Sequence, residues 1–376
     1  MKLNKPQFAG ESRRVKLNEI CTKGKSSLRQ KDVFNDGPYN VYGASGIVGT
    51  MSDYQNEIPY VAVVKDGAGV GRASACEPMT SVLGTMQALI PNSNVERDYL
   101  LHLVRSLRLG EGFSGSTIPH IYFKDYGRLE VPLPPLEAQK QIVSQLGLVE
   151  AQIEQAEAQI EQLDHLVKSR FVEMFGRAED EHSDFPVKTL DDVCASIVRG
   201  PFGSALKKEF FVPKGPGVYK VYEQKHAIQK QVDIGTYYIS SDRFETLKRF
   251  ECHPGDILMS CSGTMGRLYQ LPPNCEPGVM NQALCKFALS DSILVDYFLG
   301  FMEQVVDELG AKGSGIKNVS SVKFIKAIRI PLPPVELQGR FAAFVAQADK
   351  SRFIAQQQIE KLQMLYDSLA QEYFGD

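Results

Sequence analysis

The sequence has no apolar run long enough to cross a membrane. A membrane-spanning helix needs about 18 to 20 consecutive apolar residues, and the 376 residues contain no such run. Residues 1–10 alternate polar and apolar side chains, whereas a signal peptide has a continuous apolar centre. We therefore expect a cytoplasmic protein with no membrane partner.

Paired metal ligands are also lacking. The seven cysteines form no CxxC pair, and the six histidines include no HExxH or similar spacing. Structural and catalytic zinc sites depend on such closely spaced ligands. The sequence therefore predicts reduced thiols, no bound metal and no cofactor.

Motifs of self-contained enzymes are missing as well. There is no GxxxxGK[ST] phosphate loop and no Asn-Pro-Pro-Tyr tetrapeptide of an adenine methyltransferase. Residues 43–46 and 112–115 resemble a GxSxG nucleophile motif, but in both the second glycine comes one residue too early. We predict a protein that is not an enzyme.

The chain has no strong net charge, because its formal charge at pH 7 is only -3. The charge is unevenly distributed, however. Residues 1–131 contain 16 basic and 13 acidic side chains, and residues 187–330 contain 18 and 15. Each segment is thus +3, so the total charge does not exclude binding to the phosphates of a nucleic acid.

What the sequence does contain is a long internal repeat. Pro132-Leu-Pro-Pro-Leu-Glu-Ala-Gln139 recurs as Pro331-Leu-Pro-Pro-Val-Glu-Leu-Gln338, and the alignment continues without a gap to Gly176 and Gly375. Sixteen of these 45 positions are identical. Upstream, Gly71-Arg72 matches Gly266-Arg267. The repeating unit is one domain followed by one long helix.

Both long segments carry apolar residues at alternating steps of three and four, which is typical of a coiled coil. Two such helices can bury each other, most simply when antiparallel, as a rod roughly 60 Å long. The alternative is that each helix packs only on its own domain. The predicted helix–helix and partner interface comprises Leu146, Val149, Ile153, Ile160, Leu163, Val345, Ile359, Leu362, Tyr366 and Leu369.

The predicted fold class is α+β: two mixed α/β domains joined by two long antiparallel coiled-coil helices, with a pseudo-twofold internal repeat. Outside the helices, short strand-like segments are closely punctuated by glycine and proline. The expected boundaries are 1–131 for the first domain, 132–176 for the first helix, 177–186 for a linker, 187–330 for the second domain and 331–376 for the second helix.

Three features are candidate ligand contacts: two glycine-rich turns, two loops rich in small hydroxyl residues, and the lysine pair Lys207-Lys208. Arg72 and Arg267 close equivalent glycine-rich turns, and the segments 114–120 and 312–318 combine small hydroxyl residues with glycine. Such groups suit phosphates and base edges, although each loop could equally be a connection without a ligand, and a lysine pair is often only solvated. The candidates are Arg72, Ser116, Thr117, His120, Lys207, Lys208, Arg267, Ser314, Lys317 and Asn318.

Taken together, these features resemble the specificity subunits of type I restriction-modification enzymes. The resemblance rests on the duplicated PLPPxExQ helix entries at Pro132 and Pro331, the helices ending in Phe-Gly and the repeated domain starts at Val15 and Val187. It covers essentially the whole chain and implies that each domain is a target-recognition domain for one half of a split double-stranded DNA site. It also implies two modification (methyltransferase) subunits docked on the helices, with restriction subunits added for cleavage.

Because the two domains differ in sequence around residues 39–53 and 222–243, we expect an asymmetric site and weak DNA binding by the isolated chain. Three alternatives remain from the sequence alone. The first is a recognition module of a different methylation or defence complex, and the second is a coiled-coil scaffold that binds proteins and never contacts DNA. The third is a self-contained enzyme, which would require measurable turnover from this chain alone.

Overall fold

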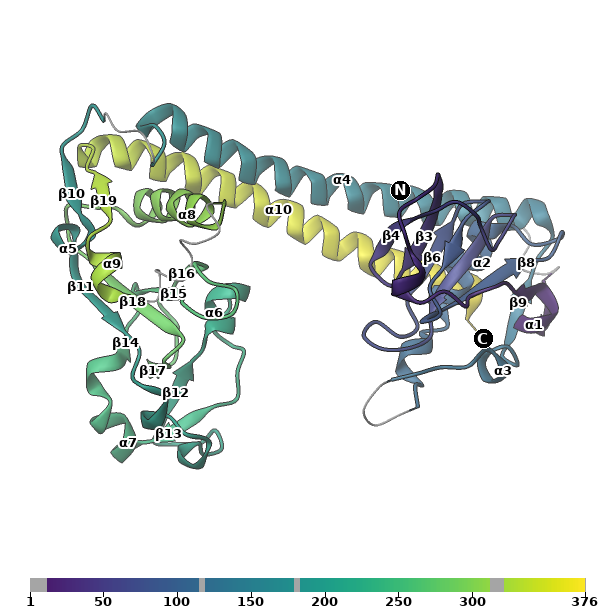
Figure 1. Ribbon diagram of the computed structural model, residues 1–376, viewed down its shortest axis with the longest axis horizontal. Helices are drawn as coiled ribbons and strands as arrows, with labels where there is room; N and C mark the ends of the chain where they lie inside the picture. Colours follow the sequence, from purple (N-terminus) through teal and green to yellow (C-terminus); the bar gives the residue numbers. More distant parts are fainter. Residues whose placement is uncertain (1–11, 115–118, 179–182, 312–320, 376) are drawn as a thin grey trace. The chain divides into compact units, whose positions relative to one another are not determined.

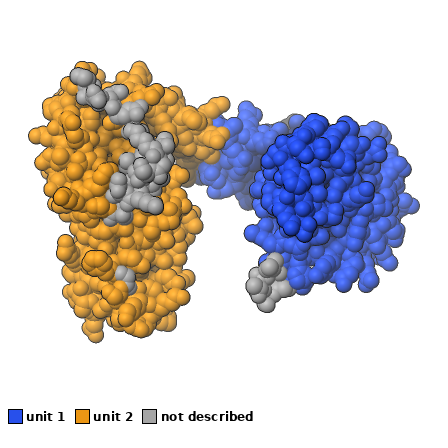
Figure 2. All heavy atoms as spheres, in the orientation of Figure 1, with its two compact units in different colours: residues 1–159, 354–376 blue, residues 160–353 orange. Residues whose placement is uncertain are grey.

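The computed structural model describes residues 12–114, 119–178, 183–311 and 321–375. These residues form two compact units (Figure 2). Unit 1 comprises residues 1–159 and 354–376, and unit 2 comprises residues 160–353. Each unit contains one α+β domain together with one part of each long helix (Figure 1).

The domain of unit 1 is built on a four-stranded antiparallel sheet in the order β2-β8-β5-β6. A three-stranded sheet, β4-β3-β7, and a two-stranded sheet, β1-β9, accompany it. The elements are β1 (Arg13–Lys16), α1 (Leu17–Ile20), β2 (Cys21–Lys23), η1 (Gln30–Asp32), β3 (Tyr39–Gly43), β4 (Gly46–Met51), β5 (Tyr60–Val64), β6 (Ala73–Cys76), β7 (Ser81–Val82), β8 (Met86–Pro91), α2 (Arg97–Ser106), η2 (Leu109–Glu111), α3 (Phe123–Tyr126) and β9 (Glu130–Leu133).

The domain of unit 2 repeats this plan with the sheets β11-β18-β15-β16, β13-β12-β17-β14 and β10-β19. Its elements are β10 (Val187–Thr189), α5 (Leu190–Val193), β11 (Cys194–Arg199), η3 (Gly203–Ala205), η4 (Lys208–Phe210), β12 (Val218–Tyr222), α6 (Gln224–Gln229), β13 (Tyr238–Ser240), α7 (Ser241–Thr246), η5 (Lys248–Phe250), β14 (Glu251–Cys252), β15 (Ile257–Ser260), β16 (Leu268–Gln270), β17 (Gly278–Met280), β18 (Leu284–Leu289), α8 (Val295–Ala311), α9 (Val322–Lys326) and β19 (Arg329–Pro331).

The sheet order confirms the repeat predicted from the sequence. The four-stranded sheets β2-β8-β5-β6 and β11-β18-β15-β16 have the same order and antiparallel pairing. The parallel pair of β3 with β7 has its equivalent in β12 with β17. The copies differ most where the sequences diverge, because β3 and β4 form a direct hairpin whereas α6 separates β12 from β13.

Two 40-residue helices follow the domains: α4 (Leu136–Phe175) and α10 (Val335–Phe374). Each begins after its proline-rich entry and ends at the residue before a glycine, as the PLPP and Phe-Gly motifs predict. Gly176 adopts φ +81°, a left-handed conformation that ends α4 without the steric cost a larger residue would have.

The two helices pack antiparallel. In unit 1, Tyr373 near the end of α10 donates a hydrogen bond to Gln145 near the start of α4. In unit 2, the rings of Phe171 near the end of α4 and Phe341 near the start of α10 lie 5.3 Å apart. This pairing of opposite ends confirms the predicted antiparallel arrangement (Figure 1).

Each helix segment packs on its own domain as well as on the other helix. One apolar cluster in unit 1 combines Leu146 and Val149 of α4, Leu369 of α10 and Leu103 of α2. In unit 2, Phe171 and Phe341 share a cluster with residues of α8. The two packing arrangements that the heptad pattern left open therefore occur together.

Candidate DNA interface

The β5–β6 turn of unit 1 carries Arg72. Gly67, Gly69 and Gly71 in this turn have φ between +84° and +85°, a conformation that side chains with a Cβ rarely adopt. Val64 and Arg72 close the turn, because the Val64 N–H donates to the Arg72 carbonyl at 2.8 Å. This is a strand-to-strand turn and not the start of a helix, and it leaves the Arg72 side chain exposed.

The β15–β16 turn of unit 2 is equivalent and carries Arg267. The Ser260 N–H donates to the Arg267 carbonyl at 2.9 Å, and the Ser260 hydroxyl accepts from the Arg267 N–H at 2.9 Å. Gly266 has φ +80°, and a Cβ there would lie 2.3 Å from the Val306 side chain of α8. Arg267 is exposed, as Arg72 is, so both turns present an arginine to solvent.

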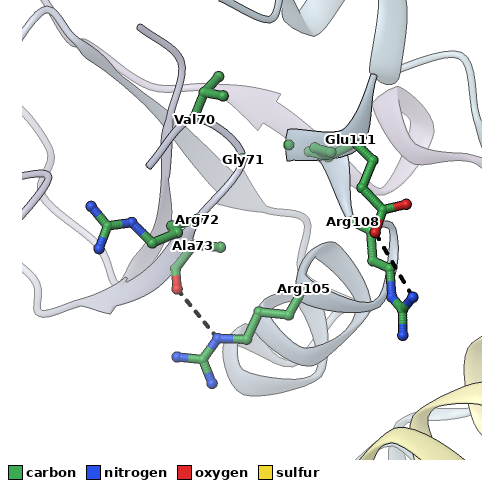
Figure 3. A pocket seen from close by; sticks show the side chains of 9 residues that line it. Val70, Gly71, Arg72, Ala73, Arg105, Arg108 and Glu111 are labelled. Carbon is green, nitrogen blue, oxygen red and sulfur yellow. Dashed lines mark hydrogen bonds and ion pairs between the residues drawn. The ribbon is translucent and has the colours of Figure 1, made fainter. Parts of the chain in front are cut away.

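Arg72 lies at the edge of a cavity of about 520 Å³ that also contains Arg105 and Arg108 (Figure 3). The Arg105 Nε donates to the Ala73 carbonyl at 3.2 Å, and its Nη1 lies 2.7 Å from the Glu150 carboxylate. Arg108 lies 3.8 Å from Glu111. Figure 3 shows the three guanidinium groups spread apart, an arrangement that suits spaced phosphates along a strand better than a single small anion.

Arg267 borders a larger cavity, of about 650 Å³, with a different charge. Its ionisable lining residues are six carboxylates (Glu161, Asp164, Asp296, Glu303, Asp307 and Asp349), four cationic side chains (Lys168, Lys230, Arg267 and Arg352) and His165. Several of these are paired, including Lys168 with Asp307 at 3.4 Å and Arg352 with Asp164 at 2.8 Å. Equivalent turns thus face surroundings of unlike charge in the two units.

The structure brings His120 next to the Arg72 turn. The Gly67 N–H donates to the Pro119 carbonyl and the Ile121 N–H donates to the Lys65 carbonyl, both at 2.9 Å. The His120 ring centroid lies 5.0 Å from that of Tyr122, which is 48% exposed. Lys124 places its Nζ 5.2 Å from the Tyr122 ring, so a cationic and aromatic surface adjoins the turn.

The remaining sequence candidates fall elsewhere. Ser116, Thr117, Ser314, Lys317 and Asn318 lie outside the described residues. Lys207 and Lys208 are exposed on a loop that packs through Leu206 on residues of β12 and β17. Arg267, in contrast, belongs to the sheet of β15 and β16, so the structure does not place the lysine pair on the same sheet as the arginine.

Of the ten residues predicted for the helix interface, three are buried: Leu146, Val149 and Leu369. The other seven are half-buried: Ile153, Ile160, Leu163, Val345, Ile359, Leu362 and Tyr366. Two arginines interrupt the apolar seam, and each meets a carboxylate. Arg170 lies 2.8 Å from Glu173, and Arg352 lies 2.8 Å from Asp164.

Sequence reasoning missed Arg105, Arg108, Tyr122 and Lys124. Arg105 lies in the last turn of α2 and Arg108 just beyond its end, and arginines three positions apart are also common on an ordinary solvated helix face. Only the folded structure places these arginines near Arg72, because the backbone at Gly71 packs closely against residue 110. A Cβ on Gly71 would lie 2.2 Å from the backbone N of Gly110. That close approach brings Arg72 to the same cavity as Arg105 and Arg108, which lie more than 30 positions later in the sequence.

Within the described ranges, no three His, Cys, Asp or Glu side chains are grouped to hold a metal ion. Burial raises the pKa of the Cys21 thiol to about 12, so this cysteine is not a thiolate at neutral pH. None of the described helices is both long and apolar enough to span a membrane.

A family model for the type I restriction modification DNA specificity domain matches residues 10–165 and 182–364. The MjaX and MjaVIII type I restriction enzyme specificity subunits of Methanocaldococcus jannaschii are each 24% identical, over 288 and 284 residues. These matches cover 73% and 70% of this chain and 67% and 66% of the relatives, or about two thirds of their length.

A solved type I restriction-modification S subunit from M. genitalium has a similar fold, with a TM-score of 0.52 and 16% identity over 100% of this chain and 98% of that one. The family model covers most of the sequence in two copies, and these copies contain the two domains that carry Arg72 and Arg267. The chain therefore belongs to the type I restriction-modification DNA specificity family, whose members recognise DNA sequence and are not catalytic.

Proposed function

We propose that this chain reads a bipartite, asymmetric DNA site, with one part read by each domain, and directs the methyltransferase and restriction subunits of a type I complex to it. The observation that carries the proposal is the duplicated domain, with the same sheet order in both copies, joined by two continuous helices. Paired recognition modules on a fixed frame read paired half-sites, and the frame sets their spacing.

The asymmetry of the proposed site follows from the differences between the copies. The β3–β4 hairpin of unit 1 corresponds in unit 2 to a region that contains α6. The cavity beside Arg72 is lined by three arginines and one glutamate, whereas six carboxylates and four cationic side chains line the one beside Arg267. Surfaces that differ in shape and charge would read different bases and hold the DNA backbone differently.

Phosphate contact is proposed chiefly for Arg72, Arg105 and Arg108, because spread guanidinium groups can follow a DNA strand. His120 and the exposed Tyr122 are proposed to reach the DNA from the adjoining loop. Lys207 and Lys208 are the proposed phosphate contacts of unit 2. Because each domain carries only +3, we expect the isolated chain to bind DNA weakly and the partner subunits to supply much of the affinity.

A methyltransferase subunit is the proposed occupant of an exposed face of α10. Ile354, Met364 and Leu365 are 56%, 63% and 39% exposed, although each is apolar. A groove of about 350 Å³ lined by Ile354, Lys361 and Leu365 lies on this face. Buried residues such as Leu146 hold the two long helices together. The contact with the methyltransferase subunit is therefore proposed for the exposed apolar residues of α10.

The proposal is tested by co-expressing the chain with the methyltransferase subunit encoded beside it and mapping methylated adenines across the host genome. We expect a new split, asymmetric motif that disappears when the chain is omitted. A palindromic motif would contradict two unlike half-sites. An unchanged methylome despite a stable complex would instead support a scaffold.

Replacing Arg72 with glutamine should weaken DNA binding by a similar factor on every sequence. Removing one phosphate contact should also reduce the slope of log K against log salt by about 1. The measurement is fluorescence anisotropy of the methyltransferase complex on specific and unrelated duplexes at several salt concentrations. Arg29→Gln is the matched control, because Arg29 is an exposed arginine of the same domain paired with Asp32 at 3.2 Å.

A loss confined to one base pair of the motif would show that Arg72 reads a base instead of a phosphate. An unchanged affinity and salt slope would exclude Arg72 from the DNA contact.

A further inference from the structure

Phe202 is the most exposed large apolar side chain in the described residues, with 90% of its surface accessible. It lies in the loop between β11 and η3. Burial of phenylalanine favours folding, so this exposure is not explained by the stability of the domain. A side chain held outside the fold in this way is available for a binding partner.

The loop around Phe202 is firmly anchored. On one side, Gly200 donates its N–H to the Leu284 carbonyl at 2.9 Å, and Pro201 is buried. A Cβ on Gly200 would lie 1.8 Å from the Asn281 carbonyl oxygen, so the backbone is pressed against the entry to β18. The position of Phe202 is therefore set on this side by contacts with the domain.

The other side is fixed as well. The Ala205 N–H donates to the Phe202 carbonyl at 2.8 Å, and the Ala205 carbonyl accepts from Arg243. The Arg243 guanidinium lies 4.1 Å from the centre of the Phe210 ring, and Leu206 is buried. Because the turn is held at both ends, the Phe202 ring can keep its position when it is pressed against a binding partner.

The surroundings of Phe202 do not resemble a protein-docking patch. Among the described residues of 187–330, the only other exposed large apolar side chain is Val187. The exposed residues that follow, in the loop and in η4, are Ser204, Lys207, Lys208 and Glu209, and the Lys207 Nζ lies 3.8 Å from the Glu209 carboxylate. Protein interfaces place apolar anchors in clusters, whereas single apolar wedges flanked by basic side chains are typical of proteins that unstack DNA.

We propose that Phe202 inserts into the base stack of the half-site read by unit 2, with Lys207 and Lys208 on the adjacent phosphates. This inference rests on the proposed function and adds a second mode of reading to it. Insertion is easiest at flexible pyrimidine–purine steps, so the wedge would favour such a step without a hydrogen bond to either base.

The test uses the complex of the full chain with its methyltransferase subunit and duplexes of the methylated motif. 2-Aminopurine replaces one adenine at a time, and its fluorescence rises when it is unstacked. We expect a rise at one step with the wild-type complex and its loss with Phe202→Ala, together with roughly 10-fold weaker binding. Phe202→Leu should retain part of both effects, because leucine is also an apolar wedge.

Phe34→Ala is the matched control, because Phe34 is a 69% exposed phenylalanine in the domain of unit 1, away from the half-site proposed for unit 2 and from the exposed face of α10. Both variants should leave the melting temperature unchanged, since neither side chain is packed. If Phe202→Ala leaves affinity and fluorescence unaltered, the wedge is excluded while the recognition function stands. If it releases the methyltransferase but spares DNA binding, Phe202 contacts protein and the inference is overturned. A wild-type complex without any sequence preference would overturn the proposed function itself.

Discussion

Replacing Gln139 with leucine is expected to destabilise unit 1 by about 4 kcal/mol. The Gln139 side chain is 0% exposed and makes three hydrogen bonds. Its Oε1 accepts from the Glu96 N–H at 2.8 Å, and its Nε2 donates to the carbonyls of Pro134 at 2.9 Å and Asn94 at 3.0 Å. Leucine would remove the partner of the buried Pro134 carbonyl and of the part-buried Glu96 N–H and Asn94 carbonyl, at about 1–3 kcal/mol each.

The repeat supplies an independent second test. Gln338 is also 0% exposed. Its Oε1 accepts from the Leu294 N–H at 2.8 Å, and its Nε2 donates to the carbonyls of Pro333 at 2.8 Å and Ser292 at 3.2 Å. Gln338→Leu should therefore cost unit 2 a similar free energy of unfolding.

Urea unfolding followed by circular dichroism measures both losses. Gln141→Leu is the control, because Gln141 is exposed on α4 two residues after Gln139. It should change stability by less than about 0.5 kcal/mol. A loss below about 1 kcal/mol for Gln139→Leu would mean that water or a rearranged loop satisfies the three backbone groups.

These glutamines explain in physical terms why PLPPxExQ occurs twice. In each unit the glutamine ties the first turn of the long helix to the loop before the domain helix. A tyrosine of that domain helix completes the joint, since the Tyr99 hydroxyl donates to the Pro132 carbonyl at 2.8 Å and the Tyr297 hydroxyl donates to the Pro331 carbonyl at 2.5 Å. The motif is the connection between domain and helix.

The sequence was sufficient to predict the repeat, the two long helices and their antiparallel packing, because heptad spacing is a local pattern that survives in one chain. It identified Gln139 as a repeated residue of the PLPPxExQ motif but not its role. Two of its partners, the backbone N–H of Glu96 and the carbonyl of Asn94, are more than 40 positions away, and backbone groups leave no signature in a sequence.

The surroundings of the candidate contacts could not be predicted for a related reason. The carboxylates near Arg267 come from α4, α8 and α10, and α4 lies more than a hundred residues before α8 in the sequence. A single repeated Gly-Arg pair therefore gave the same expectation for Arg72 and Arg267. Only the packing of the helices against each domain distinguishes their electrostatic surroundings.

Unit 1 is expected to lose stability as the pH falls from about 6.5 to about 4, because of His102. Its imidazole on α2 is 3% exposed, and Nδ1 lies 2.8 Å from the Tyr366 hydroxyl of α10. Burial, with a smaller contribution from Arg105, lowers the pKa of His102 to about 4. Glu150 lies 3.9 Å away, but its carboxylate is 2.7 Å from Arg105, which offsets its attraction for a proton on the histidine.

The sign of this pH dependence follows from whether the folded or the unfolded chain binds a proton on His102 at the higher pH. Above pH 6.5 the histidine is neutral in both states, so it contributes no pH dependence. Between pH 6.5 and 4 the unfolded chain is protonated while the folded unit is not, and stability declines as the pH falls. A difference of 2.5 in pKa corresponds to about 3 kcal/mol at most. Burial raises the pKa of Glu150, which opposes part of this trend.

The pH dependence of unfolding in His102→Gln isolates the histidine from Glu150 and every other titrating group. Glutamine is uncharged and can still bond to Tyr366, so the difference from the wild type should shrink steadily below pH 6.5. Tyr366→Phe is the control: it removes the hydrogen bond and about 1 kcal/mol of stability but keeps the imidazole. The Tyr366 hydroxyl also lowers the pKa of Glu150, so this variant should keep the histidine-dependent decline while the opposing contribution of Glu150 grows. Parallel curves for His102→Gln and the wild type would mean that the folded unit accepts the proton, and that Glu150, in place of Tyr366, then holds the imidazolium between α2 and α4.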